Sequence, residues 1–187
     1  QPLVSGQDNP EGVANNDHST LDSGQFLLKI VDFRIEGCSP RWLMGWRDIC
    51  RSTDERTVIV SVVPRVGVGN KIPLFIPSPR IGACLSAALL ANLTVLTLDF
   101  VARQKIGGTT LNYFYLKQFP VLPPARYTDA DLAFIVPRVL ELTYTAHDLK
   151  PWADDLTAAM PAADPRPASD HGQPFPWNPE RRAHLRA

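Results

Sequence analysis

The first hydrophobic pattern along the chain has the short period of β-strands. Residues 41–49 are rich in aromatic and aliphatic side chains, and Gly45 in their middle suggests a β-bulge. In residues 56–63, valine and isoleucine occupy both faces, which is typical of a central strand, and the proline that follows should end it. Because Pro73 lacks a backbone N–H, residues 71–76 are expected to form an edge or irregular strand.

The pattern then changes to the helical period over residues 81–103. Apolar side chains recur at the spacing of a helix face at Leu85, Leu89, Leu93, Leu96 and Phe100. Residues 81–98 carry no charge, and an uncharged run of this length is also long enough to span a membrane. Because serine, asparagine and threonine interrupt this run and Asp99 closes it, a core helix is favoured. We expect it to break near Asn92 into two helices and to stop at the Gly107-Gly108 pair.

The next segments predict one more strand and a long helix. Residues 113–119 contain four aromatic side chains, and the prolines after them forbid continuation, so a short strand is expected. Thr128 has the features of a helix N-cap, with two aspartates in the first turn, where carboxylates oppose the positive end of the helix dipole. This helix should run to about His147, with a kink at Pro137.

The two ends of the chain differ in composition from its middle. Residues 1–25 contain four acids, no Lys or Arg and only five hydrophobic residues, so a disordered lead-in or linker is expected. Residues 31–35 alternate apolar and polar side chains like a half-buried strand, although residues 27–31 also fit a helical face. Five prolines within residues 161–176 favour an extended linker. Asn178-Pro179-Glu180 then starts a helix with a cap, a proline and an acid.

Together these elements predict an α+β fold in which a mixed β-sheet packs against one or two helices, with disordered or extended tails. The predicted organisation is a lead-in over residues 1–25, an α+β domain over 26–150, a proline-rich linker over 151–176 and a truncated C-terminal helix over 177–187. The chain begins with Gln1, and its first methionine is Met44. We therefore expect it to be a piece of a longer protein.

The zero net charge of the chain conceals a division into three parts. Residues 37–127 contain eleven basic and four acidic side chains, a net charge of +7, and both flanks are negative. A local field of this sign concentrates phosphate near the surface, which favours a polyanionic partner. The alternative is a solvated basic face that the acidic ends balance.

Candidate catalytic chemistry is sparse. There is no G-x-S-x-G elbow, Walker loop, H-E-x-x-H motif or paired cysteine cluster, and the four histidines are scattered. The glycine-rich residues 67–70 lack the third glycine and the helix that dinucleotide binding requires, so a tight turn is expected there. We therefore assign no catalytic, cofactor-binding or metal-binding residue.

The number and spacing of the cysteines indicate whether the protein is expected to contain disulfide bonds. Cys38, Cys50 and Cys84 are spaced too widely for a zinc knuckle or a redox pair, and their odd number argues against a disulfide framework. No secretory signal pattern begins the chain. Reduced, buried thiols in a cytoplasmic protein are expected.

The basic side chains gather around turns between predicted elements, where strand-end loops can converge on one face and grip a DNA backbone. The phosphate-binding candidates are Arg47, Arg51, Arg56, Arg65, Lys71, Arg103, Lys105 and Lys117. For Arg47 and Arg56, the alternative is an ordinary surface pair with a neighbouring acid among residues 48–55.

Polar residues around the Gly-Gly turn are candidates for reading bases, because amides and hydroxyls pair with base edges in the major groove. They are Gln104, Thr109, Thr110 and Asn112. The alternative is that they satisfy their own backbone. The aromatic side chains of residues 113–115 could stack on bases, or they could be buried in the core of a strand.

Several ordered motifs carry a resemblance to a known family. They are WLMGWRDICRSTDERTVIVSVVP, KIPLF, LLANLTVLTLDFVARQKIGGTTLNYFYLKQFPVLPP and PWNPERRAHLRA. They resemble the C-terminal target-recognition region of large adenine-specific DNA methyltransferases of restriction-modification and phage-defence systems, including the DISARM and BREX groups and fused restriction-methylation enzymes. The order of strand, helix, Gly-Gly loop and strand is also similar to target-recognition domains of type I restriction specificity subunits.

The resemblance implies a function in selecting the DNA sequence to be methylated. In that family a separate domain binds S-adenosylmethionine and carries an Asn-Pro-Pro-aromatic motif for the flipped adenine. Neither that motif nor the glycine-rich cofactor loop occurs here, so S-adenosylmethionine is expected only in a catalytic domain outside this chain. The implied partners are double-stranded DNA and that catalytic domain, with no membrane. The alternative function is a protein-interaction scaffold that docks the catalytic domain or an acidic partner without contacting DNA.

Overall fold

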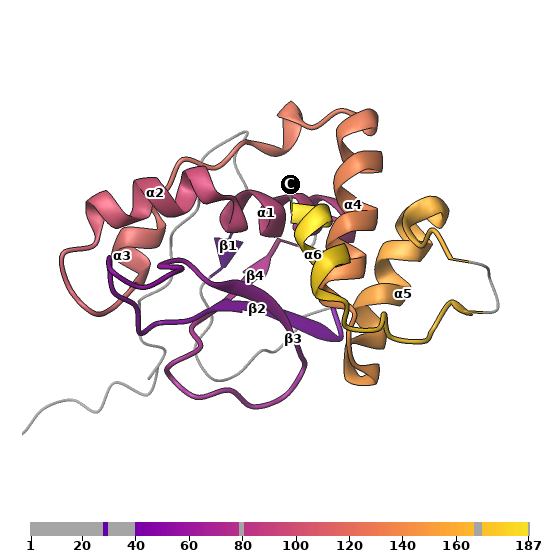
Figure 1. Ribbon diagram of the computed structural model, residues 1–187, viewed down its shortest axis with the longest axis horizontal. Helices are drawn as coiled ribbons and strands as arrows, with labels where there is room; N and C mark the ends of the chain where they lie inside the picture. Colours follow the sequence, from indigo (N-terminus) through magenta and orange to yellow (C-terminus); the bar gives the residue numbers. More distant parts are fainter. Residues whose placement is uncertain (1–27, 30–39, 79–80, 167–169, 187) are drawn as a thin grey trace, which may run out of the picture.

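The computed structural model describes residues 28–29, 40–78, 81–166 and 170–186. In Figure 1 a small sheet packs below helix α1 (Ala83–Thr94), and the later helices gather beside them. The expected lead-in over residues 1–25, the strand or helix over 27–35, apart from residues 28–29, and Cys38 lie outside the described residues. The α+β class expected from the sequence is confirmed.

The sheet contains four described strands in the order β1-β4-β2-β3, and each described pairing is antiparallel. The strands are β1 (Leu28–Lys29), β2 (Trp42–Trp46), β3 (Val60–Pro64) and β4 (Leu74–Pro77). The expected mixed sheet is therefore wrong in its strand directions, since no described pair is parallel.

Two strand positions also differ from the sequence-based expectation. β3, expected to be central, lies at the edge of the described sheet, and α1 packs against it. Val60 and Val62 are buried, whereas Ser61 between them is exposed. β4, expected at an edge, lies between β1 and β2. Pro73 does not prevent this, because it precedes β4 and contributes its carbonyl oxygen, which accepts a hydrogen bond from Trp46 N at 3.2 Å.

Gly45 is required by close packing and does not form the expected bulge. β2 pairs with β3 in unbroken register, with Gly45 opposite Ser61. A Cβ atom at Gly45 would lie 2.8 Å from the carbonyl oxygen of Pro73 and 3.0 Å from Cγ2 of Ile72. The chain that leads into β4 can therefore approach β2 only because residue 45 has no side chain.

Helix α1 occupies the centre of the structure, between the sheet and helices α4 (Asp129–Thr143) and α5 (Lys150–Ala159). Its buried residues include Ala87, Leu89, Leu90 and Leu93, which explains why a helix with partners on several sides carries no charge. α2 (Leu96–Lys105) follows after a break at Val95, close to the break expected at Asn92. Among the described helices none alone has the length and apolarity to cross a membrane, and α1 with α2 reaches them only as a pair bent by 59°.

Residues 113–119 form a helical turn, so the strand expected there is wrong. α3 (Tyr113–Leu116) is capped by Asn112, whose side-chain oxygen accepts a hydrogen bond from Tyr115 N at 3.2 Å. The hydroxyl of Tyr113 donates to the carbonyl of Leu74 at 2.9 Å, which ties the turn to the sheet. Local capping and this tertiary contact override the β-propensity of the aromatic residues. A short 3-10 turn, η1 (Pro124–Arg126), follows the prolines.

The N-cap expected for α4 is confirmed. Thr128 and Asp131 form a capping box, in which each side chain bonds the backbone N–H of the other residue. Pro137 lies inside α4 without ending it. The helix ends at Thr143, short of the expected His147, which instead begins the 3-10 turn η2 (His147–Leu149).

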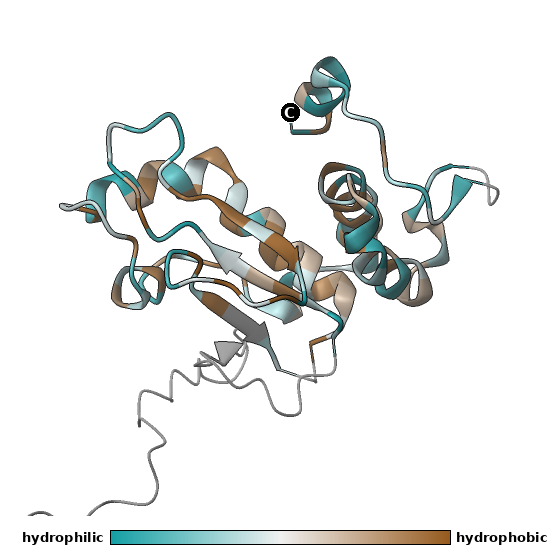
Figure 2. Cartoon of the chain, turned by 90° about the horizontal axis from the view of Figure 1, so that it is seen from below, coloured by the Kyte–Doolittle hydropathy of each residue, from teal (hydrophilic) through white to brown (hydrophobic). Residues whose placement is uncertain are grey.

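The proline-rich segment packs against the helices and is not the extended linker expected for it. α5 brings Trp152 into the core, and η3 (Pro161–Ala163) follows it. Phe175 is buried, and its N–H donates to the carbonyl of Tyr144 at 2.8 Å. α6 (Pro179–Arg186), mostly hydrophilic in Figure 2, begins at the expected cap, where Asn178 Oδ1 accepts from Arg181 N at 2.8 Å.

Substitution of Gly45 by alanine should destabilise the protein by about 1–3 kcal/mol, because the new methyl group overlaps backbone that cannot move without disturbing β4. Urea denaturation followed by tryptophan fluorescence measures the loss. Gly69→Ala is the matched control, since nothing lies within 4 Å of a Cβ at that position. Equal stability of the two variants would contradict this account of Gly45.

Candidate nucleic-acid interface

Two polar segments that are far apart in the sequence meet at one end of the structure. Cys50 N donates to the carbonyl of Thr109 at 3.0 Å, and Leu111 N donates to the carbonyl of Asp48 at 2.7 Å. The indole N–H of Trp46 also donates to the Leu111 carbonyl, at 2.6 Å. The Gly-Gly loop (residues 106–112) is thereby fixed against the turn that follows β2.

A buried carboxylate holds the other side of this turn to helix α2. Asp99 is 3% exposed, and its Oδ1 accepts hydrogen bonds from Thr57 N at 2.9 Å and Val58 N at 2.7 Å. Its Oδ2 accepts from Arg103 Nε at 2.9 Å, and Arg56 Nε lies 3.7 Å from Oδ1. A carboxylate with several donors of this kind can remain charged although it is buried.

The surroundings of Asp99 favour its ionised form. Burial alone would raise the pKa of this carboxyl group, but the hydrogen bonds from Val58 and Arg103 and the charges of Arg56 and Arg103 lower the pKa below its ordinary value. Its contribution to stability is therefore complete above the unfolded-state pKa of about 3.9 and is lost as the pH falls through the lower folded-state pKa.

Three of the candidate phosphate-binding arginines are used within this network. Besides Asp99, Arg103 donates to the carbonyls of Ser52 at 3.0 Å and Glu55 at 2.6 Å. Arg56 donates to the carbonyl of Thr94, at the end of α1. Arg47 donates to Asp54 and to the carbonyl of Arg56, both at 2.9 Å. The surface pairing weighed for Arg47 is present, and Arg56 pairs with Asp99, an acid outside its own turn.

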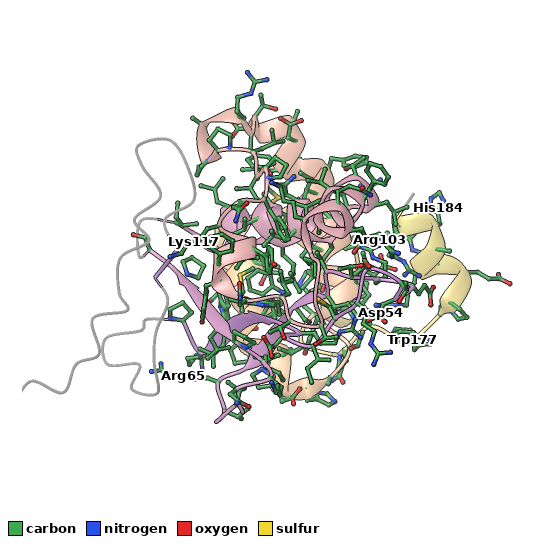
Figure 3. The ribbon with its side chains drawn as sticks, turned by 90° about the vertical axis from the view of Figure 1, so that its left-hand side faces the viewer. Asp54, Arg65, Arg103, Lys117, Trp177 and His184 are labelled. Atoms are coloured by element: carbon green, nitrogen blue, oxygen red, sulfur yellow. The ribbon has the colours of Figure 1, made fainter. Side chains whose placement is uncertain are left out.

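Two further candidate cations also have protein partners. Lys71 Nζ lies 3.0 Å from Asp48 Oδ2, which is buried, and Arg65 donates to the carbonyl of Pro40 at 3.4 Å. Figure 3 looks onto this end of the molecule and places Arg65 and Lys117 on the side opposite Arg103 and Asp54. The eight candidate cations therefore do not converge on a single patch.

The side chains of four other candidates are exposed and could contact a ligand. Within residues 40–78 and 81–166, Arg51, Gln104, Lys105 and Lys117 are exposed and make no side-chain hydrogen bond or ion pair to a described residue. Arg51 lies between Cys50, which bonds the Gly-Gly loop, and Ser52, whose carbonyl binds Arg103. Gln104 and Lys105 end α2 beside that loop. Arg51, Gln104 and Lys105 therefore border the same two joined segments.

The polar residues of the Gly-Gly loop have partly structural roles. Thr110 forms an isolated antiparallel bridge with Ile49, and the Thr109 carbonyl bonds Cys50. Asn112 uses its side-chain oxygen to cap α3, as the alternative interpretation supposed, which leaves its amide N–H groups for another partner. The side chains of Thr109 and Thr110 are exposed.

The two described cysteines are not activated thiols. Cys50 and Cys84 are free thiols, and burial raises the pKa of both, which suppresses the thiolate form. No three His, Cys, Asp or Glu side chains in the described ranges lie close enough together to hold a metal ion. The described end of the molecule therefore offers hydrogen-bond donors and positive charge.

Sequence reasoning missed the role of Asp99 in organising this region and named it only as the residue that closes the uncharged run 81–98. The available signal was its position as the sole acid within residues 56–128, where five arginines and three lysines also lie in the sequence. Comparison with known proteins adds no further assignment, because no family model, curated protein or solved structure matches the chain.

Replacing Asp99 by asparagine should cost about 3 kcal/mol of stability at neutral pH, because Arg56 and Arg103 lose the charge that compensates their partial burial. Urea unfolding at pH values from 7 to 3 measures the effect. The advantage of the wild type over the variant should shrink below about pH 4 as Asp99 becomes protonated in both states.

Asp54→Asn is the control, since Asp54 is a third exposed and bonds only Arg47 and the Arg51 N–H among the described residues. Its effect should be below about 1 kcal/mol. A wild-type advantage over Asp99→Asn that stays constant down to pH 3 would show that the carboxylate charge does not stabilise the fold.

Proposed function

We propose that this chain is a DNA-binding target-recognition module of an adenine-specific DNA methyltransferase or restriction-modification enzyme, and that it selects the sequence to be methylated. The Gly-Gly loop, fixed between β2 and α3, would enter the major groove. Arg51, Lys105 and Lys117 would contact phosphates, and Gln104 and the free amide of Asn112 would read base edges. S-adenosylmethionine and the methyl-transfer chemistry would belong to a cytoplasmic catalytic partner domain.

One observation carries this proposal: the Gly-Gly loop, which contains Asn112 and adjoins Gln104, is held to residues 48–50 by two backbone hydrogen bonds. The two backbone bonds from Cys50 and Leu111 pre-organise it before any ligand binds. A recognition loop that is already ordered loses little conformational entropy on binding, so its contacts contribute more to affinity. The resemblance of the ordered motifs to target-recognition regions is a second reason for the same proposal.

The number of unpaired cations sets the expected salt dependence. Three phosphate contacts from Arg51, Lys105 and Lys117 give a slope of about −3 in a plot of log affinity against log salt concentration, so affinity should fall about 40-fold between 50 and 200 mM salt. This is weaker than the dependence expected if all eight cations were available. Arg103→Ala should act mainly on stability, because its guanidinium group bonds the protein itself.

The double variant Arg51→Gln/Lys105→Gln should bind duplex DNA about tenfold more weakly at 50 mM salt and reduce the salt slope by about two, since each cation accounts for about one unit. Fluorescence anisotropy with a labelled duplex measures both quantities. The matched control is Arg126→Gln/Arg186→Gln, which removes two exposed cations from η1 and α6. Failure of the wild type to bind duplex DNA at 50 mM salt, or equal losses in both double variants, would reject the proposal.

A second function is supported by an apolar pair on α2. Leu96 and Phe100 lie one turn apart on this helix and are 72% and 65% exposed. Large apolar side chains left in water at helical spacing are typical of a surface that packs against another protein. The chain would then act as a scaffold that docks the catalytic domain or an acidic partner.

Leu96→Ser/Phe100→Ser separates the two functions. It should abolish association with the parent catalytic domain in analytical ultracentrifugation and leave duplex affinity unchanged if both functions are present. If the chain is a scaffold alone, the catalytic domain but not DNA should protect the Gly107-Gly108 bond from proteolysis. Phe134→Ser, which removes an exposed aromatic side chain from α4, serves as the control.

A further inference from the structure

Phe114 is an aromatic side chain that the fold leaves in solvent beside the Gly-Gly loop. It is 69% exposed, although it stands between Tyr113, which is half-buried, and the helical turn that buries Leu116. The ring of Phe114 contributes little to the core, and its apolar surface is accessible to a ligand.

The backbone around Phe114 is held firmly on both sides. Asn112 caps the turn before it, and the Tyr113 hydroxyl anchors the turn to Leu74 in β4. The Tyr113 ring also packs edge-on against Trp46, with ring centroids 4.7 Å apart. After Phe114, the side-chain amide of Gln118 donates to its carbonyl at 3.0 Å. The ring is therefore presented from a fixed support.

The other exposed aromatic rings with a cation nearby differ from Phe114. The Arg138 guanidinium lies 3.6 Å from the centroid of the Phe134 ring, and that of Arg182 lies 4.1 Å from the Trp177 ring. Within the described residues no such cation covers Phe114, whose one ring contact is the edge of Tyr115 at 5.6 Å. One aromatic face is thus available for stacking.

The charged residues near Phe114 in the sequence indicate which kind of ligand its ring would bind. Residues 100–128 contain no Asp or Glu, and Lys117 follows Phe114 by three positions, which places both on the same side of the helical turn. Lys117 is exposed, and its side chain makes no hydrogen bond or ion pair to a described residue. A flat apolar face beside a cation matches a nucleobase attached to a phosphate backbone.

We infer that Phe114 stacks on a nucleobase that has left the base stack of the bound DNA, with Lys117 on the adjoining phosphate. This inference rests on the proposed DNA-binding function and adds a contact that needs no sequence-specific hydrogen bond. Aromatic side chains that insert at a disrupted base step stabilise unpaired bases, and alanine substitution at such stacks weakens binding by about tenfold or more.

The test compares a fully paired duplex with a duplex of the same sequence that carries one unpaired 2-aminopurine as a bulge. The wild type should bind the bulged duplex about tenfold more tightly and change the 2-aminopurine fluorescence on binding, because the ring of Phe114 stacks on the exposed base. Phe114→Ala should remove this preference and the fluorescence change. The salt slope should not change, since the substitution removes no charge.

Two further variants make the result specific. Phe114→Trp should retain the preference for the bulged duplex, whereas Phe134→Ala should behave like the wild type, because its ring already carries Arg138. Wild-type binding to both duplexes with equal affinity, or an unchanged preference in Phe114→Ala, would overturn the stacking role and leave the proposed DNA-binding function intact. Absence of wild-type binding to either duplex would overturn both.

Discussion

The hydrogen bonds of the Asp99 carboxylate are the constraint on which the candidate surface depends. They join α2 to residues 57 and 58, just before β3, and they set where the turn after β2 and the Gly-Gly loop can lie. A carboxylate that is 3% exposed must be compensated, and two backbone N–H groups and two arginines supply the compensation. The positive charges that maintain this arrangement cannot at the same time be available to a ligand.

The division between structural and available cations follows from this. Arg47 and Arg103 bond main-chain carbonyl oxygens of the turn, and Arg56 ties the turn to the end of α1 through the Thr94 carbonyl. Arg51 and Lys105 border the same turn and loop, and their side chains make no hydrogen bond or ion pair to a described residue. The net charge of +7 over residues 37–127 therefore overstates what this region can offer to phosphate.

The central position of α1 explains how a small sheet can belong to a stable domain. The sheet has short strands, and α1 covers β3 on one side and contacts α4 and α5 on the other. The core runs without interruption from Trp46 in the sheet through Leu89 to Trp152 in α5. Because the aromatic segment at residues 113–116 is tied to this core through Tyr113, the neighbouring Phe114 is left outside it.

The sequence by itself determined the features that depend on local chemistry. The α+β class, the strand at residues 42–46, the break between two helices, the Thr128 N-cap and the Asn178 cap all follow from the hydrophobic period or from side chains that bond nearby backbone. Only the tertiary structure decided the order of the strands, the role of Gly45 and the helical conformation of residues 113–116, because each depends on a segment distant in the sequence. The same reason applies to the basic residues: their number is a property of the sequence, but their availability depends on which carboxylates and carbonyl groups folding brings within reach.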